Sequence, residues 1–193
     1  MKTSISKNSN YEKYLSIIIF FATIISFFIG FLLRENSAGG GLIDLSHEWH
    51  NYLLLKQDIL GFLYGNYEAS RFPLFHILNL KLNPFINSQS DFILSFFIYS
   101  FILILTYYYC LVFTFKNQQK HIIFLLLSIL LLSPYFRTSS FWGLQENLAY
   151  IFFLASFALY EKKKIKLLVI FVSFLSFYSD QKYIFVPAIF FFK

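Results

Sequence analysis

LSIIIFFATIISFFIGFLL, residues 15–33, is an apolar run of the length that a bilayer core requires, roughly 20 residues. Lys2, Lys7 and Lys13 precede it, as basic residues also precede the apolar part of a cleaved signal peptide. The run is longer than the ~7–15 apolar residues of such a peptide, and the Arg-Glu-Asn that follows is a poor cleavage site. The sequence therefore predicts a retained transmembrane helix.

The composition also indicates a membrane protein. Hydrophobic residues make up 58% of the chain and charged residues only 13%, whereas a soluble domain usually carries about a quarter charged residues. The 28 Phe and 14 Tyr residues leave too little polar surface to cover a water-exposed globule. The lysines and arginines behind the net charge of +6 are spread over the segments between apolar runs, which argues against a nucleic-acid partner and for the lipid bilayer.

Further apolar runs follow the first along the whole chain. They predict an all-α polytopic membrane protein, a single membrane domain over residues 1–193. We expect about six transmembrane helices, near residues 15–33, 92–115, 122–135, 148–160, 167–178 and 183–193. The last run is truncated after about ten residues, too few to cross a bilayer, so we expect the chain to be the front part of a longer protein.

The connecting segments differ in their basic residues. One set carries Lys2, Lys7, Lys13, Lys116, Lys120, Lys162, Lys163, Lys164 and Lys166, and the short segments of the other set carry Arg137 and Lys182. The positive-inside rule then predicts a cytoplasmic N-terminus in the cell membrane and makes residues 162–166 a topology signal. The long segment 34–91 and its acidic residues would lie on the periplasmic, extracellular or lumenal face.

The outer segment 34–91 contains the first candidate for chemistry. Apolar residues at helical spacing predict short helices near 45–56 and 73–80, lying along the membrane surface. Asp44 would stand at or near the N-cap of the first helix, where it could simply stabilise that helix. Alternatively, Asp44 projects a carboxylate into a cavity at the bilayer boundary, where partial desolvation would raise its basicity.

Three neighbours of Asp44 raise the question of a metal site. His47, Glu48 and His50 have the spacing His-Glu-x-His, which differs from the His-Glu-x-x-His that places two zinc ligands one helical turn apart. We therefore expect neither a metal nor another cofactor. These side chains then form a solvated helix face or contact a substrate.

Other ionisable and polar residues fall on the same predicted outer face. Arg is suited to phosphate binding, but such residues at span ends also serve as interfacial anchors or mark the water boundary. The predicted topology places these residues on one side of the membrane. It does not predict that they line the same cavity. The candidates are Arg71, His76, Arg137, Glu146, Asn147, Asp180 and Lys182.

Three stretches around these residues resemble the N-terminal part of multi-pass glycosyltransferases of the GT-C superfamily. They are Asp44-Leu-Ser-His-Glu-Trp-His with Ser70-Arg-Phe-Pro-Leu-Phe-His76, Ser133-Pro-Tyr-Phe-Arg137 through Gln145-Glu-Asn-Leu-Ala149, and Tyr178-Ser-Asp-Gln-Lys-Tyr-Ile-Phe-Val-Pro187. The chain departs from relatives that carry an Asp-Glu pair in the first outer loop, since Leu45 follows Asp44, and Lys182 is the cation nearest to where an Arg is usual.

The resemblance implies a hexosyl- or pentosyltransferase whose donor is a sugar on a polyprenyl phosphate and whose acceptor is a glycan, lipid or protein. It implies a catalytic base in the first outer loop: Asp44, or Glu48 if the register is shifted. His47, His50, Arg71, His76, Arg137, Glu146, Asn147, Asp180 and Lys182 would bind substrate. The alternatives are a multi-pass transporter and a non-catalytic membrane assembly subunit.

The predicted orientation can be tested with single cysteines introduced at Gln89 and Lys164. Because the lysine asymmetry places residues 34–91 outside and 162–166 inside, an impermeant thiol reagent added to intact cells should label only the cysteine at position 89. The native Cys110 lies inside an apolar run and serves as the background control. Labelling at position 164 alone would reverse the predicted topology.

Overall fold

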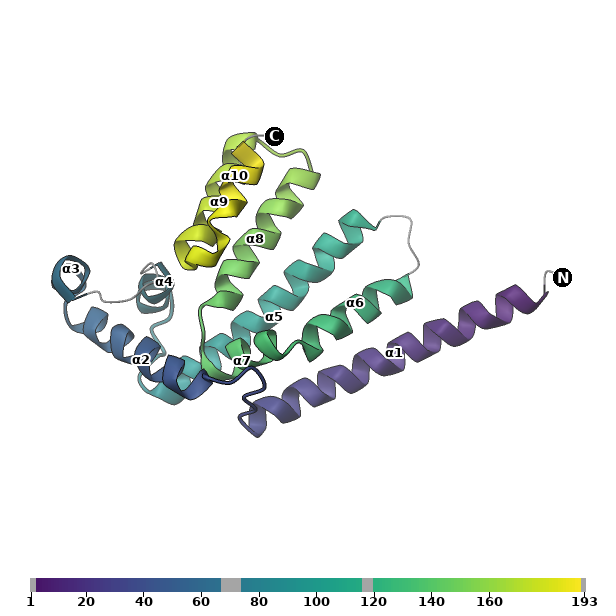
Figure 1. Ribbon diagram of the computed structural model, residues 1–193, viewed down its shortest axis with the longest axis horizontal. Coiled ribbons are helices and arrows are strands. Elements are labelled where there is room, and N and C mark those ends of the chain that lie inside the picture. The colour runs from purple at the N-terminus through teal and green to yellow at the C-terminus, as the bar shows by residue number, and fades with distance from the viewer. Residues whose placement is uncertain (1–2, 67–73, 116–119, 192–193) are drawn as a thin grey trace.

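The computed structural model describes residues 3–66, 74–115 and 120–191, and these residues form helices and connections without a strand. The all-α prediction is therefore confirmed for the described part of the chain (Figure 1). The helices are α1 Thr3–Leu32, α2 Gly41–Gln57, α3 Ile59–Gly61, the π-helix η1 Phe62–Asn66, α4 Leu74–Leu82, α5 Gln89–Thr114, α6 Lys120–Leu132, α7 Pro134–Trp142, α8 Glu146–Glu161, α9 Lys166–Ser179, the 3₁₀-helix η2 Gln181–Tyr183 and α10 Phe185–Phe191.

Two helical segments are long and apolar enough to cross a membrane, Tyr11–Leu32 of α1 and Gln89–Thr114 of α5. A third span results if α6 and α7, which meet at a bend of 60°, count as one element. The predicted spans 148–160 and 167–178 fall in α8 and α9, which have 16 and 14 residues and are shorter than the roughly 20 residues of a typical span. The described part of the predicted last span contains only the seven residues of α10.

The two short helices predicted in the outer segment are present as α2 and α4. Gly40 caps α2 with a positive φ of 73° and no side-chain hydrogen bond. Asp44 therefore lies near the N-terminus of α2, in its first turn, but it is not the N-cap residue, because the helix begins three residues earlier. Pro73, predicted in the first turn of the second helix, lies outside the described residues.

The connection expected between the predicted spans 122–135 and 148–160 is mostly helical. Ser133 accepts a hydrogen bond from the Phe136 amide at its side-chain oxygen, and Pro134 occupies the first helical position, where its missing N–H costs nothing. These two residues end α6 and start α7. Gly143 ends α7 with a φ of 74°, in the left-handed region that favours glycine. The predicted loop is thus a buried helix.

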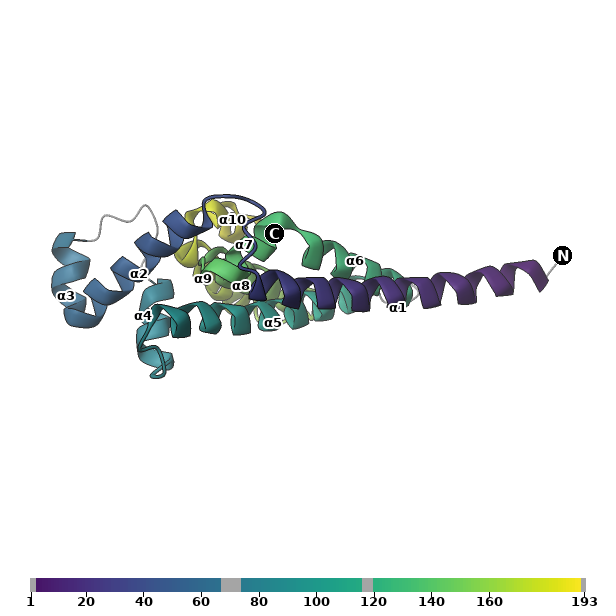
Figure 2. The same ribbon diagram turned by 90° about the horizontal axis from the view of Figure 1, so that it is seen from below.

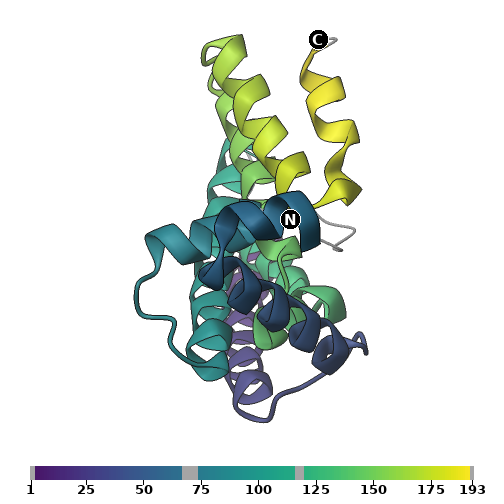
Figure 3. The same cartoon turned by 90° about the vertical axis from the view of Figure 1, so that its left-hand side faces the viewer.

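The longer helices meet at one end of the molecule. Figure 1 shows α1, α5, α6 and α8 coming together around α7 and spreading apart toward the opposite end. The molecule is thin in the perpendicular direction, with α2 to α4 extending beyond the ends of α1 and α5 (Figure 2). Figure 3 looks onto this end, where α2 and α4 lie in front of the longer helices.

Phenylalanine rings form the core where the helices meet. Phe27 of α1 is 1% exposed and lies parallel to the rings of Phe97 and Phe136, at centroid distances of 5.6 and 5.4 Å. Phe141 of α7 packs on the same ring at 4.9 Å. Aromatic pairs at such distances add ~0.5–1.5 kcal/mol each beyond the area they bury, so this cluster fixes α7 against α1 and α5.

A charged side chain lies beside this core. Arg137 is 5% exposed, and its guanidinium forms an ion pair with Glu35, just beyond the end of α1. It also donates to the carbonyl oxygens of Ser26 and Leu131 at 3.0 and 3.2 Å. Because a buried cation is costly unless it is paired and hydrogen-bonded, these contacts hold the ends of α1 and α6 against α7.

Glu35→Gln is expected to lower the free energy of unfolding at neutral pH by about 1–3 kcal/mol, since it removes the charged partner of Arg137. The pKa of Glu35 lies below its ordinary value of 4.5, mainly because Arg137 donates hydrogen bonds to the carboxylate. The extra stability of the wild type over Glu35→Gln is therefore fully present above pH 4.5. It is lost as the pH falls through the lowered pKa of Glu35. Thermal unfolding in detergent at several pH values measures it.

Glu12→Gln provides the matched control, because Glu12 is an exposed acid at the far end of α1. Its unfolding temperature should follow that of the wild type at every pH. A difference between wild type and Glu35→Gln that stays constant into the acid range would contradict the role of the Glu35 charge.

Candidate functional site

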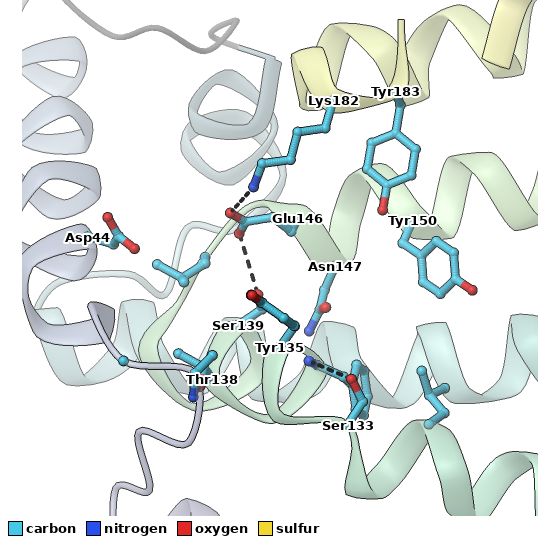
Figure 4. A pocket seen from close by; sticks show the side chains of 15 residues that line it. Asp44, Ser133, Tyr135, Thr138, Ser139, Glu146, Asn147, Tyr150, Lys182 and Tyr183 are labelled. Atoms are coloured by element: carbon cyan, nitrogen blue, oxygen red, sulfur yellow. Dashed lines mark hydrogen bonds and ion pairs between the residues drawn. The ribbon is translucent and has the colours of Figure 1, made fainter. Parts of the chain in front are cut away.

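One cavity, of about 630 Å³, opens at the end where the helices meet (Figure 4). Six segments line it: the connection after α1, α2, the junction of α6 and α7, the connection between α7 and α8, the start of α8, and η2. Its lining residues are Ala38, Gly39, Asp44, Leu130, Ser133, Tyr135, Phe136, Thr138, Ser139, Leu144, Glu146, Asn147, Tyr150, Lys182 and Tyr183. The cavity therefore combines an apolar wall with four candidates from the sequence: Asp44, Glu146, Asn147 and Lys182.

Short contacts between α1, α2 and α7 position one wall. The Ala38 amide donates to Thr138 Oγ1 at 3.0 Å, and the Trp142 indole N–H donates to the Glu35 carbonyl at 2.8 Å. Gly41 opens α2 directly against Trp142: a Cβ on Gly41 would lie 2.6 Å from the indole ring. The absence of a side chain at Gly41 thus lets α2 approach α7, and this places Asp44 at the cavity.

The opposite wall carries a pair of charges. Lys182 Nζ lies 3.2 Å from Glu146 Oε1, and Glu146 Oε2 lies 3.5 Å from the Ser139 hydroxyl. The Lys182 side chain is 63% exposed, so its ammonium group has room to turn toward a ligand in the cavity. Figure 4 shows Asp44 on α2 across the cavity from Glu146 and Lys182.

Two further candidates support this wall. Asp180 is 1% exposed; its carboxylate accepts from the Lys182 backbone amide at 2.9 Å and lies 3.8 Å from Lys182 Nζ. Asp180 therefore caps η2 and orients Lys182. The Asn147 amide donates to the Ser140 hydroxyl at 2.9 Å, which anchors the first turn of α8 to α7.

The remaining candidates in the first outer segment do not line the cavity. Glu48 and His76 are both buried and pair at 2.9 Å, Glu48 Oε2 to His76 Nε2, which ties α2 to α4. His47 and His50 are exposed on α2. Arg71 lies outside the described residues. Within the described ranges, no group of three or more His, Cys, Asp or Glu side chains is placed to hold a metal ion.

Arg137 also does not line the cavity. Its guanidinium is directed to Glu35 and to the backbone of α1 and α6, so the structure gives it a positioning role in place of the predicted contact with a substrate phosphate. Thr138, Ser139, Tyr150 and Tyr183 line the cavity and were missed by the sequence. The sequence Ser133-Pro134 could have predicted two of them, because it is typical of a helix start. A helix that begins there carries Thr138 and Ser139 on α7.

No family model, no curated protein and no solved structure matches this chain. The function has to be inferred from the chemistry of the cavity itself.

Because α2 and α7 approach closely at Gly41, adding one methyl group there is expected to destabilise the fold. Gly41→Ala should lower the free energy of unfolding by about 1–3 kcal/mol, because Trp142 or the whole start of α2 must shift. Gly65→Ala is the control, since a Cβ there meets nothing within 4 Å. Thermal unfolding in detergent compares the two variants. Equal unfolding temperatures would show that α2 is not held by this contact.

Proposed function

We propose that this chain belongs to a membrane glycosyltransferase of the GT-C type, which transfers a sugar from a polyprenyl-phosphate donor to an acceptor hydroxyl. The observation that carries the proposal is the cavity that has Asp44 on one wall and the Glu146–Lys182 pair on the other. A base and a mobile cation across one cavity are what glycosyl transfer from a phosphate requires.

The reaction assigns a role to each wall. Asp44 takes the proton from the acceptor hydroxyl while the acceptor oxygen forms a bond to the anomeric carbon. The bond between that carbon and the phosphate oxygen breaks, and its electron pair leaves with the lipid phosphate. Lys182 moves from Glu146 toward the phosphate and neutralises the charge that develops on it, as cations do in other phosphate sites.

The size and lining of the cavity support a lipid-linked donor. A volume of about 630 Å³ is within the ~300–1,000 Å³ typical of small-molecule sites. Leu130, Tyr135, Phe136 and Leu144 supply apolar surface beside the charged groups. In this proposal all six apolar helices insert, with α8 to α10 as short spans, and the cavity faces the non-cytoplasmic side.

The distribution of charge favours this enzyme over a transporter, the other class considered. Transport pathways place ionisable residues inside their spans. In the two candidate spans, Tyr11–Leu32 and Gln89–Thr114, the only charged residues are Glu12, Lys13 and Asp91, all within the first three positions. The polar groups gather instead around the cavity at the helix ends.

Asp44→Asn is expected to reduce sugar transfer by roughly 10²–10⁴-fold, the usual loss when a general base is removed. The substitution keeps the shape of the side chain, and Asp44 makes no capping bond that folding needs. Transfer of labelled sugar from a polyprenyl-phosphate donor in membrane vesicles measures the rate, with expression and unfolding temperature recorded alongside.

Asp58→Asn makes the same chemical change at the other end of α2. Asp58 caps α3 by accepting from the Gly61 amide at 3.0 Å, and Asn caps equally well, so activity should be retained. If Asp44→Asn is active and Glu48→Gln is inactive although folded, the base is Glu48. If both are active, this outer segment does not supply the base.

A further inference from the structure

A second hollow, of about 380 Å³, lies at the opposite end of α8 from the Asp44 cavity. It is lined by Tyr160, Glu161, Lys163, Lys164, Lys166, Val169 and Phe190. Glu146 begins α8 at the first cavity and Glu161 ends it at this hollow, so the 16 residues of α8 separate the two by about 24 Å. Figure 1 shows the connection between α8 and α9 far from α7. The two sites are therefore distinct.

The hollow has a strongly basic rim. Lys163, Lys164 and Lys166 face one acid, Glu161, and Lys162 is adjacent in the chain. Among the ion pairs of residues 3–66, 74–115 and 120–191, none includes Lys163, Lys164 or Lys166. All three lysines are exposed, so their charges are available to an anion.

The floor of the hollow is apolar. Val169 is 2% exposed and Phe190 4% exposed, and the rings of Tyr160 and Phe190 lie 5.4 Å apart. An inorganic anion gains no favourable contact from apolar side chains, whereas the glycerol backbone and first methylenes of a lipid would cover them. The lining therefore matches an amphipathic anion better than a free ion.

The level of the hollow along the helices fits a lipid headgroup. Lys162 Nζ lies 4.3 Å from the ring centroid of Phe113, one residue before the end of the candidate span Gln89–Thr114. This contact holds the lysine-rich connection at the level where α5 leaves the bilayer. Basic pockets at this level bind the headgroups of anionic lipids.

The backbone conformation of Lys163 makes this lysine a useful position for a substitution. Lys163 has a φ of 52°, and its amide donates to the Tyr160 carbonyl in the turn that closes α8. Glycine is the usual residue in this left-handed position, because a side chain there is disfavoured. Lys163 therefore carries a local conformational cost that a glycine would not, as does Arg34 after the end of α1.

We propose that the hollow formed by Lys163, Lys164 and Lys166 over Val169 and Phe190 is a specific binding site for one anionic phospholipid. The phosphate lies among the lysines and the glycerol and upper acyl chains lie on the apolar floor. The site is independent of the chemistry at Asp44. It gives the basic residues 162–166, which the sequence predicts to be a topology signal, a second role as a lipid-binding site.

The test titrates the purified full chain in detergent with dihexanoyl phosphatidylglycerol, dihexanoyl phosphatidylcholine or inorganic phosphate and counts bound molecules by native mass spectrometry. Detergent removes any effect of membrane orientation. We expect one phosphatidylglycerol per chain and clearly weaker binding of phosphatidylcholine. Equal binding of inorganic phosphate would overturn the lipid assignment, and equal binding of the two lipids would overturn the role of charge.

Two sets of variants separate a pocket from diffuse attraction. Lys163→Gln, Lys164→Gln and Lys166→Gln together should weaken binding on the order of a hundredfold, about fivefold for each lysine. The charge-matched control replaces the exposed lysines Lys13, Lys81 and Lys120 by Gln and should bind as the wild type does. Equal losses in both triple variants would mean that net surface charge alone attracts the lipid.

The variant Lys163→Gly separates a loss of lipid binding from a loss of folding. Glycine relieves the left-handed conformation, so the unfolding temperature should stay unchanged or rise while phosphatidylglycerol binding weakens about fivefold. Full binding in this variant would remove Lys163 from the site.

Discussion

The buried guanidinium of Arg137 constrains the arrangement of the whole converging end. A cation at 5% exposure needs several acceptors, and here these come from Glu35, the Ser26 carbonyl and the Leu131 carbonyl. The rings of Phe27 and Phe141 lie 6.0 and 5.4 Å from it. If α1 or α6 separates from α7, the buried guanidinium loses hydrogen-bond acceptors, and separation of the Glu35 segment also removes its charged partner. The Asp44 wall of the cavity and the α6–α7 junction that lines it are held together at this point.

A second ion pair, between Lys182 and Glu146, has the opposite character. Its lysine is 63% exposed, and such a pair contributes little to stability, on the order of 0–1 kcal/mol. It can therefore open when a ligand competes for the cation. The two ion pairs therefore differ in role. The buried Arg137–Glu35 pair holds helices together, and the more exposed Lys182–Glu146 pair lies at the cavity, where Lys182 can change its partner.

The sequence predicted the helical class, the two long spans and the helices α2 and α4, because each follows from apolar periodicity over many residues. It missed α7, whose polar Thr138 and Ser139 resemble a loop until the cap at Ser133 is considered. Placing Asp44, Glu146 and Lys182 on one face followed from the alternation of the helices. Their sharing of one cavity did not, since that depends on the close contact of Gly41 with Trp142.

Arg137 shows why composition alone misassigns roles. An arginine beside a membrane boundary indicates phosphate binding, yet the nearest acid in space, Glu35, is 102 residues away along the chain. No local pattern encodes such a pairing. Burial decides the role, and burial depends on how α1 packs on α7.

The bend between α6 and α7 bears on the water in the Asp44 cavity. Breaking a helix frees carbonyl groups, but here the Leu130 carbonyl accepts from the Ser133 amide, the Leu131 carbonyl from Arg137 and the Ser133 carbonyl from the Arg137 amide. These backbone groups at the break are satisfied by the protein itself, and this is what the backbone of a segment inside a bilayer would need. An incoming molecule can therefore enter the cavity beside this break without disrupting those backbone hydrogen bonds.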